Sequence, residues 1–349
     1  MKRAGAAFLF VFGMLAISGA AVMADTLPVA GAELSALKAK YRRPEAIPFP
    51  DGNAYSEAKA ELGQMLFFDP RLSKENNLSC ASCHNPSLAW EDGQVTAVGA
   101  ALTRLRRHTP SILNLAWGEL YFWDGRAASL EEQALGPIQS EVEMAQPLPQ
   151  LVDELNAIPG YRQAFDAAFP GAGISADTIA RAIATYERTV VSGAAPFDRW
   201  IEGDETAISD SAKRGFIAFN GAAGCAGCHV AWNFTDHSFH DIGLPNERDL
   251  GRFDRLPLPT MKFAFKTPGL RDIARRAPFM HDGSMPTLDA VIEHYAQGMA
   301  DRPSLSRQVK RFELSHTIKA DLVAFLLTLS SADPPATPPA LPGGEQSIH

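Results

Sequence analysis

Cysteine is scarce in this chain, with only four among 349 residues, so a framework of many disulfides is excluded. Positive charge is also in the minority, because 40 acidic residues outnumber 32 lysines and arginines and leave a formal net charge of −8. This balance argues against a nucleic-acid-binding protein, which carries a basic surface. Past the first 24 residues, no apolar run reaches the roughly 20 residues that a membrane helix needs. These absences leave a globular protein that acts on small molecules or on other proteins.

The one long apolar run lies at the start of the chain. Lys2 and Arg3 precede an apolar stretch at residues 6–17, and small residues follow up to Ala24. This order is typical of a secretory signal peptide cleaved after Ala24, and it predicts export to the periplasm without a membrane span in the mature protein. An N-terminal membrane anchor is the alternative, but the run is short for a bilayer.

All four cysteines belong to two copies of the motif C-x-x-C-H. The motifs consist of Cys80, Cys83 and His84, and of Cys225, Cys228 and His229. Two thiols one helical turn apart can bond to the two vinyl groups of a haem, and the adjacent histidine then presents a nitrogen to the iron. Two disulfides would leave both histidines unexplained, and structural zinc takes four ligands. The motifs therefore predict two covalently bound c-type haems.

An internal repeat accompanies the two motifs. The segment TPSILNLA at 109–116 matches TPGLRDIA at 267–274, at an offset of 158 residues. Further single matches follow at the same offset, where Asp124, Gly125 and Leu130 recur as Asp282, Gly283 and Leu288. So short a word can match by chance, but the constant offset and the paired haem motifs favour duplication of a single-haem domain.

The repeat predicts a mainly α-helical protein with two cytochrome-c-like haem domains related by internal duplication. We expect the N-terminal haem domain at 25–195 and the C-terminal haem domain at 196–330. Residues 331–349 are rich in proline and glycine and are predicted to be a disordered tail.

Apolar periodicity predicts individual helices within these domains. Helices are expected at 56–68, 175–191 and 211–219, and Ser315 is positioned to cap a last one. Residues 25–50 contain four prolines and are expected to form an extended lead.

The two halves differ where an iron would take its second axial ligand. A helix capped by Thr287 would carry Tyr295 on its apolar face toward the second haem, whereas His294 lies about 100° further round. The counterpart of Tyr295 in the first half is Pro137, which has no group that can bind iron and is expected to end its helix. These positions predict a closed second haem and an open first haem that can bind peroxide or oxygen.

Other side chains near the haems have both a chemical and a packing interpretation. Gln133 and Glu143 are expected beside the open haem, where a carboxylate can move the proton that O–O cleavage needs. Glu143 also fits a surface charge in a loop. Trp123 stands where the repeat has His281, and a tryptophan between two haems can carry an electron, although a core position is the alternative. Packing is likewise the alternative for Tyr295.

These features resemble the bacterial dihaem cytochrome c peroxidase and MauG family, over residues 55–330. The resemblance rests on both haem motifs and on the segments at 62–73, 122–127, 137–144, 265–268 and 280–283. It implies a mostly helical fold of two facing cytochrome-c-like domains. Trp123 matches the family's tryptophan between the haems, and Glu143 matches its active-site glutamate. Tyr295 and Gln133 are similar to MauG, in which a tyrosine binds the second iron.

The resemblance implies a periplasmic oxidoreductase that uses hydrogen peroxide to reach a high-valent dihaem state and oxidises a protein partner. In MauG that partner is the methylamine dehydrogenase precursor, whose tryptophan-derived quinone is completed, so a role in methylamine utilization is implied. The alternative is a cytochrome c peroxidase, which reduces peroxide with electrons from a small cytochrome c or a cupredoxin. A non-enzymatic dihaem electron carrier, with both irons closed, is the third.

The chain departs from the family at several positions. Arg104 stands about where the peroxidases carry a distal histidine, which further favours an open first haem. His108 replaces the asparagine that binds calcium between the domains, and the remaining ligands would be the backbone carbonyls of Arg276 and Pro278. One calcium ion is thus a possible additional cofactor.

MauG also draws electrons through a surface tryptophan two residues before its second haem motif. This chain has Ala223 at that position. Trp232, just past the motif, is a substitute candidate, with packing as its other interpretation.

Overall fold

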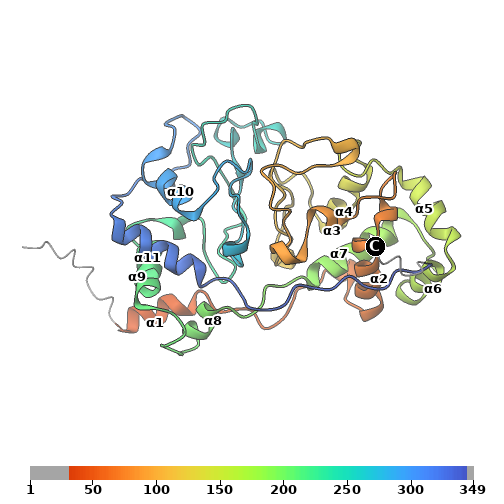
Figure 1. Ribbon diagram of the computed structural model, residues 1–349, viewed down its shortest axis with the longest axis horizontal. Helices are drawn as coiled ribbons and strands as arrows, with labels where there is room; N and C mark the ends of the chain where they lie inside the picture. Colours follow the sequence, from red (N-terminus) through yellow and green to blue (C-terminus); the bar gives the residue numbers. More distant parts are fainter. Residues whose placement is uncertain (1–30, 344–349) are drawn as a thin grey trace, which may run out of the picture.

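The computed structural model describes residues 31–343 and has a group of helices at each end of an elongated molecule (Figure 1). The first group consists of α2 Glu57–Phe68, α3 Cys80–Cys83, α4 Leu130–Gln139, α5 Leu148–Ala157, α6 Pro159–Ala168 and α7 Ala176–Thr189. The second consists of α1 Gly31–Ala39, α8 Pro196–Ile201, α9 Asp210–Asn220, α10 Leu288–Glu293 and α11 His316–Leu327. Two short strands, β1 Phe239–His240 and β2 Phe265–Lys266, pair antiparallel. The expected signal peptide, with cleavage after Ala24, lies outside the described residues.

Side-chain caps begin the helices that the sequence predicts. Ser56, Ser175 and Ser315 each accept a hydrogen bond from the backbone N–H three residues later, and α2, α7 and α11 start directly after them. The helix predicted at 211–219 is α9, which Ser209 caps in the same way. Helices dominate the described part of the chain, so the mainly helical fold class is confirmed. Within residues 31–343, no helix has both the length and the apolar character that crossing a membrane requires.

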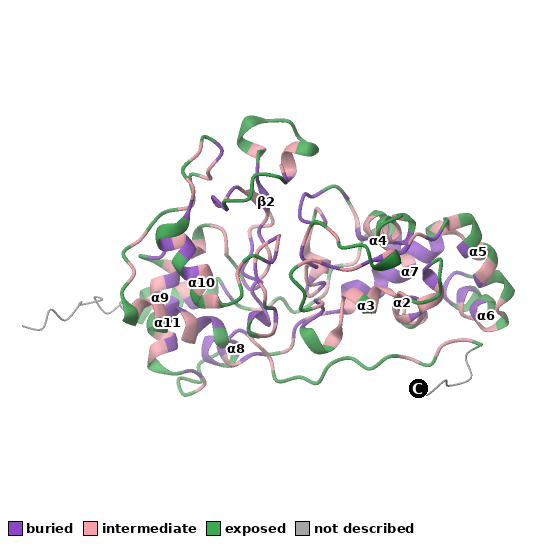
Figure 2. Cartoon of the chain, turned by 45° about the horizontal axis from the view of Figure 1, so that its top comes forward, coloured by how far each residue is buried: buried purple, intermediate pink, exposed green. Residues whose placement is uncertain are grey.

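Two large, separate apolar cores hold the helix groups together, and buried residues line the inward sides of the helices (Figure 2). In the first core α2 packs along α7, and a side chain at Gly63 would meet the Ala182 carbonyl at 2.0 Å, so only glycine permits this approach. The second core is aromatic: Phe197, Phe216 and Phe325 lie with ring centroids 5.5–5.6 Å apart. Each half therefore has apolar contacts of its own.

The N-terminal segment differs from the expected extended lead. Residues 31–39 form helix α1, and Tyr41 after it is buried in the second core rather than the first. Lys38 fixes this position, since its ammonium donates to the Trp200 carbonyl at 3.1 Å and to a Glu205 oxygen at 2.7 Å. The described part of the chain thus begins, at residue 31, against the C-terminal helices and then crosses to the N-terminal ones.

The C-terminal segment differs from the expected disordered tail in its described part. Residues 331–343 form an extended segment without helix or strand, which runs from the end of α11 to the far side of the first helix group (Figure 1). Arg71 donates to the Pro342 carbonyl at 3.0 Å, and Gln64 donates to the Thr337 carbonyl at 3.4 Å. Proline stiffens an unfolded chain, so ordering this segment costs less entropy than its lack of apolar residues suggests.

Backbone geometry recurs at the offset of 158 residues. Asn114 and Asp272 both adopt the left-handed conformation, with φ of 62° and 58°. The antiparallel bridge between Tyr121 and Ala127 has its counterpart 158 residues later, between Phe279 and Met285. α4 and α10 begin at matching positions, after a capping serine or threonine.

The repeat ends where the two helices differ. α4 continues through Pro137 to Gln139, whereas the sequence predicts that Gly136 and Pro137 end it. Pro137 lies in the last turn, where its missing N–H removes a single intrahelical bond, so the helix tolerates it. α10 is shorter and opens into a π-helical turn, His294–Gly298, which carries Tyr295.

Candidate active site

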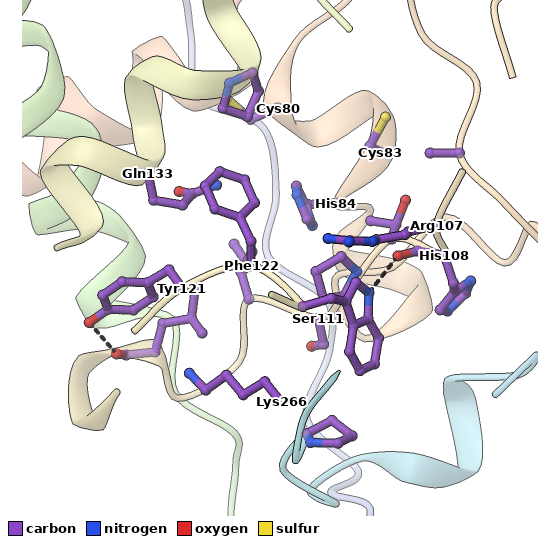
Figure 3. Close-up of a pocket in the computed structure, with 18 of the residues that line it drawn as sticks. Cys80, Cys83, His84, Arg107, His108, Ser111, Tyr121, Phe122, Gln133 and Lys266 are labelled. Atoms are coloured by element: carbon purple, nitrogen blue, oxygen red, sulfur yellow. Dashed lines mark hydrogen bonds between the residues drawn. The ribbon is translucent and has the colours of Figure 1, made fainter. Parts of the chain in front are cut away.

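The first haem motif opens into a cavity of about 620 Å³ (Figure 3). Cys80 and Cys83 lie at the two ends of the single-turn helix α3, and the His84 backbone N–H closes that turn on the Cys80 carbonyl at 2.8 Å. Ser79 caps the turn through Ser82, whose hydroxyl accepts from the Ser79 N–H at 2.9 Å. This local structure places both thiols and the imidazole on the wall of one cavity.

Each motif histidine is oriented by a backbone carbonyl. The Nδ1 atom of His84 lies 3.1 Å from the Trp90 carbonyl, and that of His229 lies 2.8 Å from the Phe234 carbonyl. Burial lowers the pKa of both imidazoles, so they stay neutral and Nδ1 carries the donated proton. The Nε2 lone pair is then left for a metal, which is the usual arrangement of a histidine that binds iron. The residues present therefore fit two covalently attached haems.

The second motif lines a smaller cavity of about 180 Å³. Tyr295 lines it together with Cys225, Cys228 and His229. Burial is the main cause that raises the pKa of Tyr295, and the nearby Cys225 and Cys228 add to it. His294 is not available to this cavity, because its Nε2 is 2.8 Å from the Ile242 carbonyl. The structure therefore brings Tyr295, and not His294, to the second haem motif.

The first cavity brings together the residues that the sequence analysis assigned to peroxide chemistry. Gln133, Pro137 and Glu143 line it, along with His84. Glu143 is held by its own backbone, whose carbonyl accepts from the Ala100 N–H at 2.7 Å. The Gln133 side-chain oxygen is buried and has no hydrogen-bond partner among the described residues. Its amide is consequently available to a ligand in the cavity.

Trp123 lines both cavities. Its ring is buried, and its Nε1–H donates to the His108 carbonyl at 2.8 Å. The Trp123 carbonyl accepts from the backbone N–H of Lys266 at 2.9 Å, which joins the two halves. These hydrogen bonds anchor Trp123 where it lines both cavities.

Comparison with known proteins agrees with this geometry. The family model for di-haem cytochrome c peroxidase matches residues 57–206. The methylamine utilization protein MauG of Methylorubrum extorquens is 50% identical over 334 residues, covering 95% of this chain and 94% of the relative. The cytochrome c551 peroxidase of Pseudomonas aeruginosa is 36% identical over 316 residues, covering 87% of this chain and 88% of the relative.

The chain belongs to the dihaem cytochrome c peroxidase and MauG family. It is a dihaem peroxidase-type oxidoreductase that carries two c-type haems. Among solved structures, a MauG-like protein associated with microbial copper homeostasis superimposes with a TM-score of 0.77 at 32% identity, covering 83% of this chain and 95% of that one. The dihaem peroxidase BthA of Burkholderia thailandensis shares the fold, with a TM-score of 0.69 over 80% of this chain and 87% of that one.

The structure gives no support to His108 as a calcium ligand. Its Nδ1 is 2.7 Å from the Gln94 carbonyl, and its Nε2 is 3.0 Å from a Glu91 oxygen. The other Glu91 oxygen accepts from Arg276 at 2.7 Å. Glu91, His108 and Arg276 are all buried, and Glu91 and Arg276 form an ion pair at this junction of the halves. The positive charge of Arg276 thus stands where the calcium ion was expected.

The structure also places three further positions at which this chain departs from its relatives. Trp232 is buried against Trp117, with ring centroids 4.7 Å apart, so the structure places it in the packing role. Ala223 is buried in the second core. Arg104 lies on the exposed rim of the first cavity.

Sequence reasoning assigned no role to two polar residues that line the cavities, Glu187 and Lys266, and it noted His281 only as the repeat counterpart of Trp123. Glu187 and Lys266 line the first, and His281 lines the second with its Nε2 buried and unpaired within the described chain. Glu187 had a visible signal, because it follows Ile183 by one helical turn and so interrupts the apolar face of α7. Lys266 and His281 lie in segments that carry the family resemblance, but their places on the cavity walls depend on distant parts of the chain.

Proposed function

We propose that this protein is a periplasmic, MauG-like oxidoreductase that uses hydrogen peroxide to oxidise a protein partner, in the first instance a methylamine dehydrogenase precursor. The observation that supports this proposal most strongly is the difference between the two cavities. Tyr295, whose phenol oxygen can bind iron, lines the second cavity. Its counterpart Pro137 lines the first cavity and has no group that can bind iron, so this position is left free for peroxide. The 50% identity with a methylamine utilization protein MauG supports the choice of partner.

In this proposal, Glu143 moves the proton at the first haem. A haem held by Cys80, Cys83 and His84 would supply the iron and the oxidising chemistry of a peroxidase. The Glu143 carboxylate would take a proton from one oxygen of hydrogen peroxide and pass it to the other oxygen, which leaves as water. The Gln133 amide hydrogen-bonds the peroxide and orients it for this transfer.

Trp123 and Tyr295 connect the first haem to the second. Trp123 lines both cavities and is the route by which an electron passes between them. Tyr295 is the proposed second ligand of the iron on His229. Haem attachment would convert Cys225 and Cys228 into thioethers, which cannot ionise, and ferric iron would supply the cation that offsets the burial of a tyrosinate.

We also propose that the two halves are duplicated haem domains, approximately at 25–195 and 196–330. The supporting observations are the two separate cores and the backbone geometry that recurs at the offset of 158 residues. Residues 31–41 are an exception, because they pack on the second core.

A cytochrome c peroxidase is the second candidate. The open first cavity serves this activity equally well, and the 36% identity with a cytochrome c551 peroxidase favours it. Its electrons would come from a small cytochrome c or a cupredoxin.

Stoichiometric peroxide distinguishes the candidates. Optical and EPR spectra of the oxidised protein are recorded before and after one equivalent of hydrogen peroxide is added. A high-spin haem that reacts without prior reduction, followed by oxidation of added methylamine dehydrogenase precursor, supports the MauG-like function. Reaction only after half-reduction supports the peroxidase. Two low-spin haems that do not react contradict both and indicate an electron carrier.

A further inference from the structure

A buried carboxyl group that the proposed mechanism does not use lies on the wall of the first haem cavity. Glu187, on α7, lines this cavity and is only 4% exposed. Its Oε2 atom has no hydrogen-bond partner in the described part of the chain. A carboxylate in such a place must either find a positive charge or hold a proton.

No cation in the surrounding helices neutralises Glu187. The adjacent Arg188 directs its two terminal nitrogens to Glu131 on α4, at 2.7 and 3.0 Å. The other titratable groups that interact with Glu187 are Cys80 on α3 and the phenols of Tyr121 and Tyr186, all neutral at physiological pH.

The protonated form is therefore favoured in the protein alone. Burial raises the pKa of Glu187 to about 8, a larger effect than the opposing attraction of Arg188, and Glu131 raises it further. Lys266 also lines the cavity, and its ammonium donates to a backbone carbonyl, that of Leu120. Burial lowers the pKa of Lys266 to about 8, and its hydrogen-bond partner is the Leu120 carbonyl and not Glu187.

The haem adds a charge that changes with its redox state. A ferric haem carries one more positive charge than a ferrous haem, in a cavity that Glu187 shares with His84 and Cys80. In a medium of low dielectric constant, that unit of charge favours the carboxylate in the ferric state and the carboxylic acid in the ferrous state.

We propose that Glu187 takes up a proton when the first haem is reduced and releases it when that haem is oxidised. One electron passes to the iron from a small redox protein or a chemical mediator, and one proton passes from solvent to a Glu187 oxygen. Oxidation reverses both transfers. The proposal rests on a haem at His84, which both candidate functions require, and it does not depend on the partner.

The test is the reduction potential of the first haem as a function of pH, measured by spectroelectrochemistry on the dihaem protein. The reduction potential should fall as pH rises, by up to about 59 mV per pH unit. This is the shift that a tenfold change in proton activity produces when one proton is taken up with one electron. In Glu187→Gln, an isosteric change, this slope disappears. Glu187→Asp keeps a carboxyl group and keeps a slope.

Glu154→Gln is the matched control. Glu154 is also a carboxylate of the first helix group, but its oxygens accept from Gln146 and Gln150 at 2.7 and 2.8 Å, away from the cavity residues. This variant should keep the wild-type slope. A slope that persists in Glu187→Gln places the proton on another group, such as a propionate or Lys266, and overturns the proposal.

A second measurement needs no variant. The infrared difference spectrum between reduced and oxidised wild-type protein should contain the C=O band of a protonated carboxylic acid, shifted in D₂O. Glu187→Gln should lack this band and Glu154→Gln should retain it. A wild-type spectrum without such a band contradicts the proposal, even if Glu187→Gln proves unable to fold.

Discussion

Glu91 is the most informative single position for the way the two halves are joined. Its side chain is 4% exposed and bonds to Arg276 of the other half at 2.7 Å and to His108 at 3.0 Å. In Glu91→Gln, the side chain keeps its shape but loses its negative charge. One of the two acceptor oxygens becomes an NH₂ group, so a donor then points at either Arg276 or His108, which are donors themselves. Arg276, itself 8% exposed, is then left as a buried charge without a counter-ion.

The expected cost follows from this burial. Removing one partner of a buried ion pair typically costs about 3–5 kcal/mol. At roughly 2–4 °C per kcal/mol for a cooperative unit of about 150–250 residues, the melting temperature falls by roughly 6–20 °C. Circular dichroism during heating measures this loss, with haem content determined separately.

The control is Glu202→Gln, since Glu202 forms a 3.4 Å pair with Arg42 in which both side chains are more than half exposed. Such a pair contributes about 1 kcal/mol or less. If Glu91→Gln loses no more than the control, the reasoning about the buried network is refuted.

The same variant changes the pH dependence of stability. Burial by itself lowers the pKa of His108, but the hydrogen bond and charge of Glu91 outweigh it and raise the pKa above its ordinary value. The contribution of His108 to stability is therefore complete below the unfolded pKa of about 6.5 and is lost as pH rises through the folded pKa. Denaturant titrations across this range should show that loss in the wild type and not in Glu91→Gln.

Three further variants test the haem sites. Tyr295→Phe should convert the second haem from low spin to high spin in the EPR spectrum and leave the first unchanged; an unaltered low-spin signal excludes Tyr295 as the ligand. Glu143→Gln should slow the reaction with peroxide by roughly 10²–10⁴-fold in stopped-flow measurements, and an unchanged rate assigns the proton transfer elsewhere. Trp123→Phe should lose about 1–3 kcal/mol of stability, because the buried His108 carbonyl loses its donor. In rapid mixing it should also slow electron exchange between the haems, and exchange at the wild-type rate removes Trp123 from the path.

The elements that local chemistry dictates were predictable. Serine caps and apolar periodicity located α2, α7 and α11 to within a residue or two. Gly136 and Pro137 misled because the position of a proline within a turn decides whether a helix survives it. The N-terminal helix and the described part of the tail were missed because hydrogen bonds to distant residues hold them, such as Lys38 to Trp200 and Arg71 to Pro342.

By itself, the sequence determined the chemistry that neighbouring residues carry out together. C-x-x-C-H places two thiols and an imidazole within one turn, so the haem attachment needs no tertiary information. It also determined the family, since identity with relatives extends along almost the whole chain.

Tertiary structure alone decided which distant groups share a cavity. Trp123 lines both haem cavities, Tyr295 and not His294 reaches the second, and His108 is occupied by Glu91. The proton affinity of Glu187 was likewise undetermined by sequence, because it depends on burial and on Arg188 being committed to Glu131. A residue's type states what it can donate or accept, but only the fold places it beside a partner, a void or water.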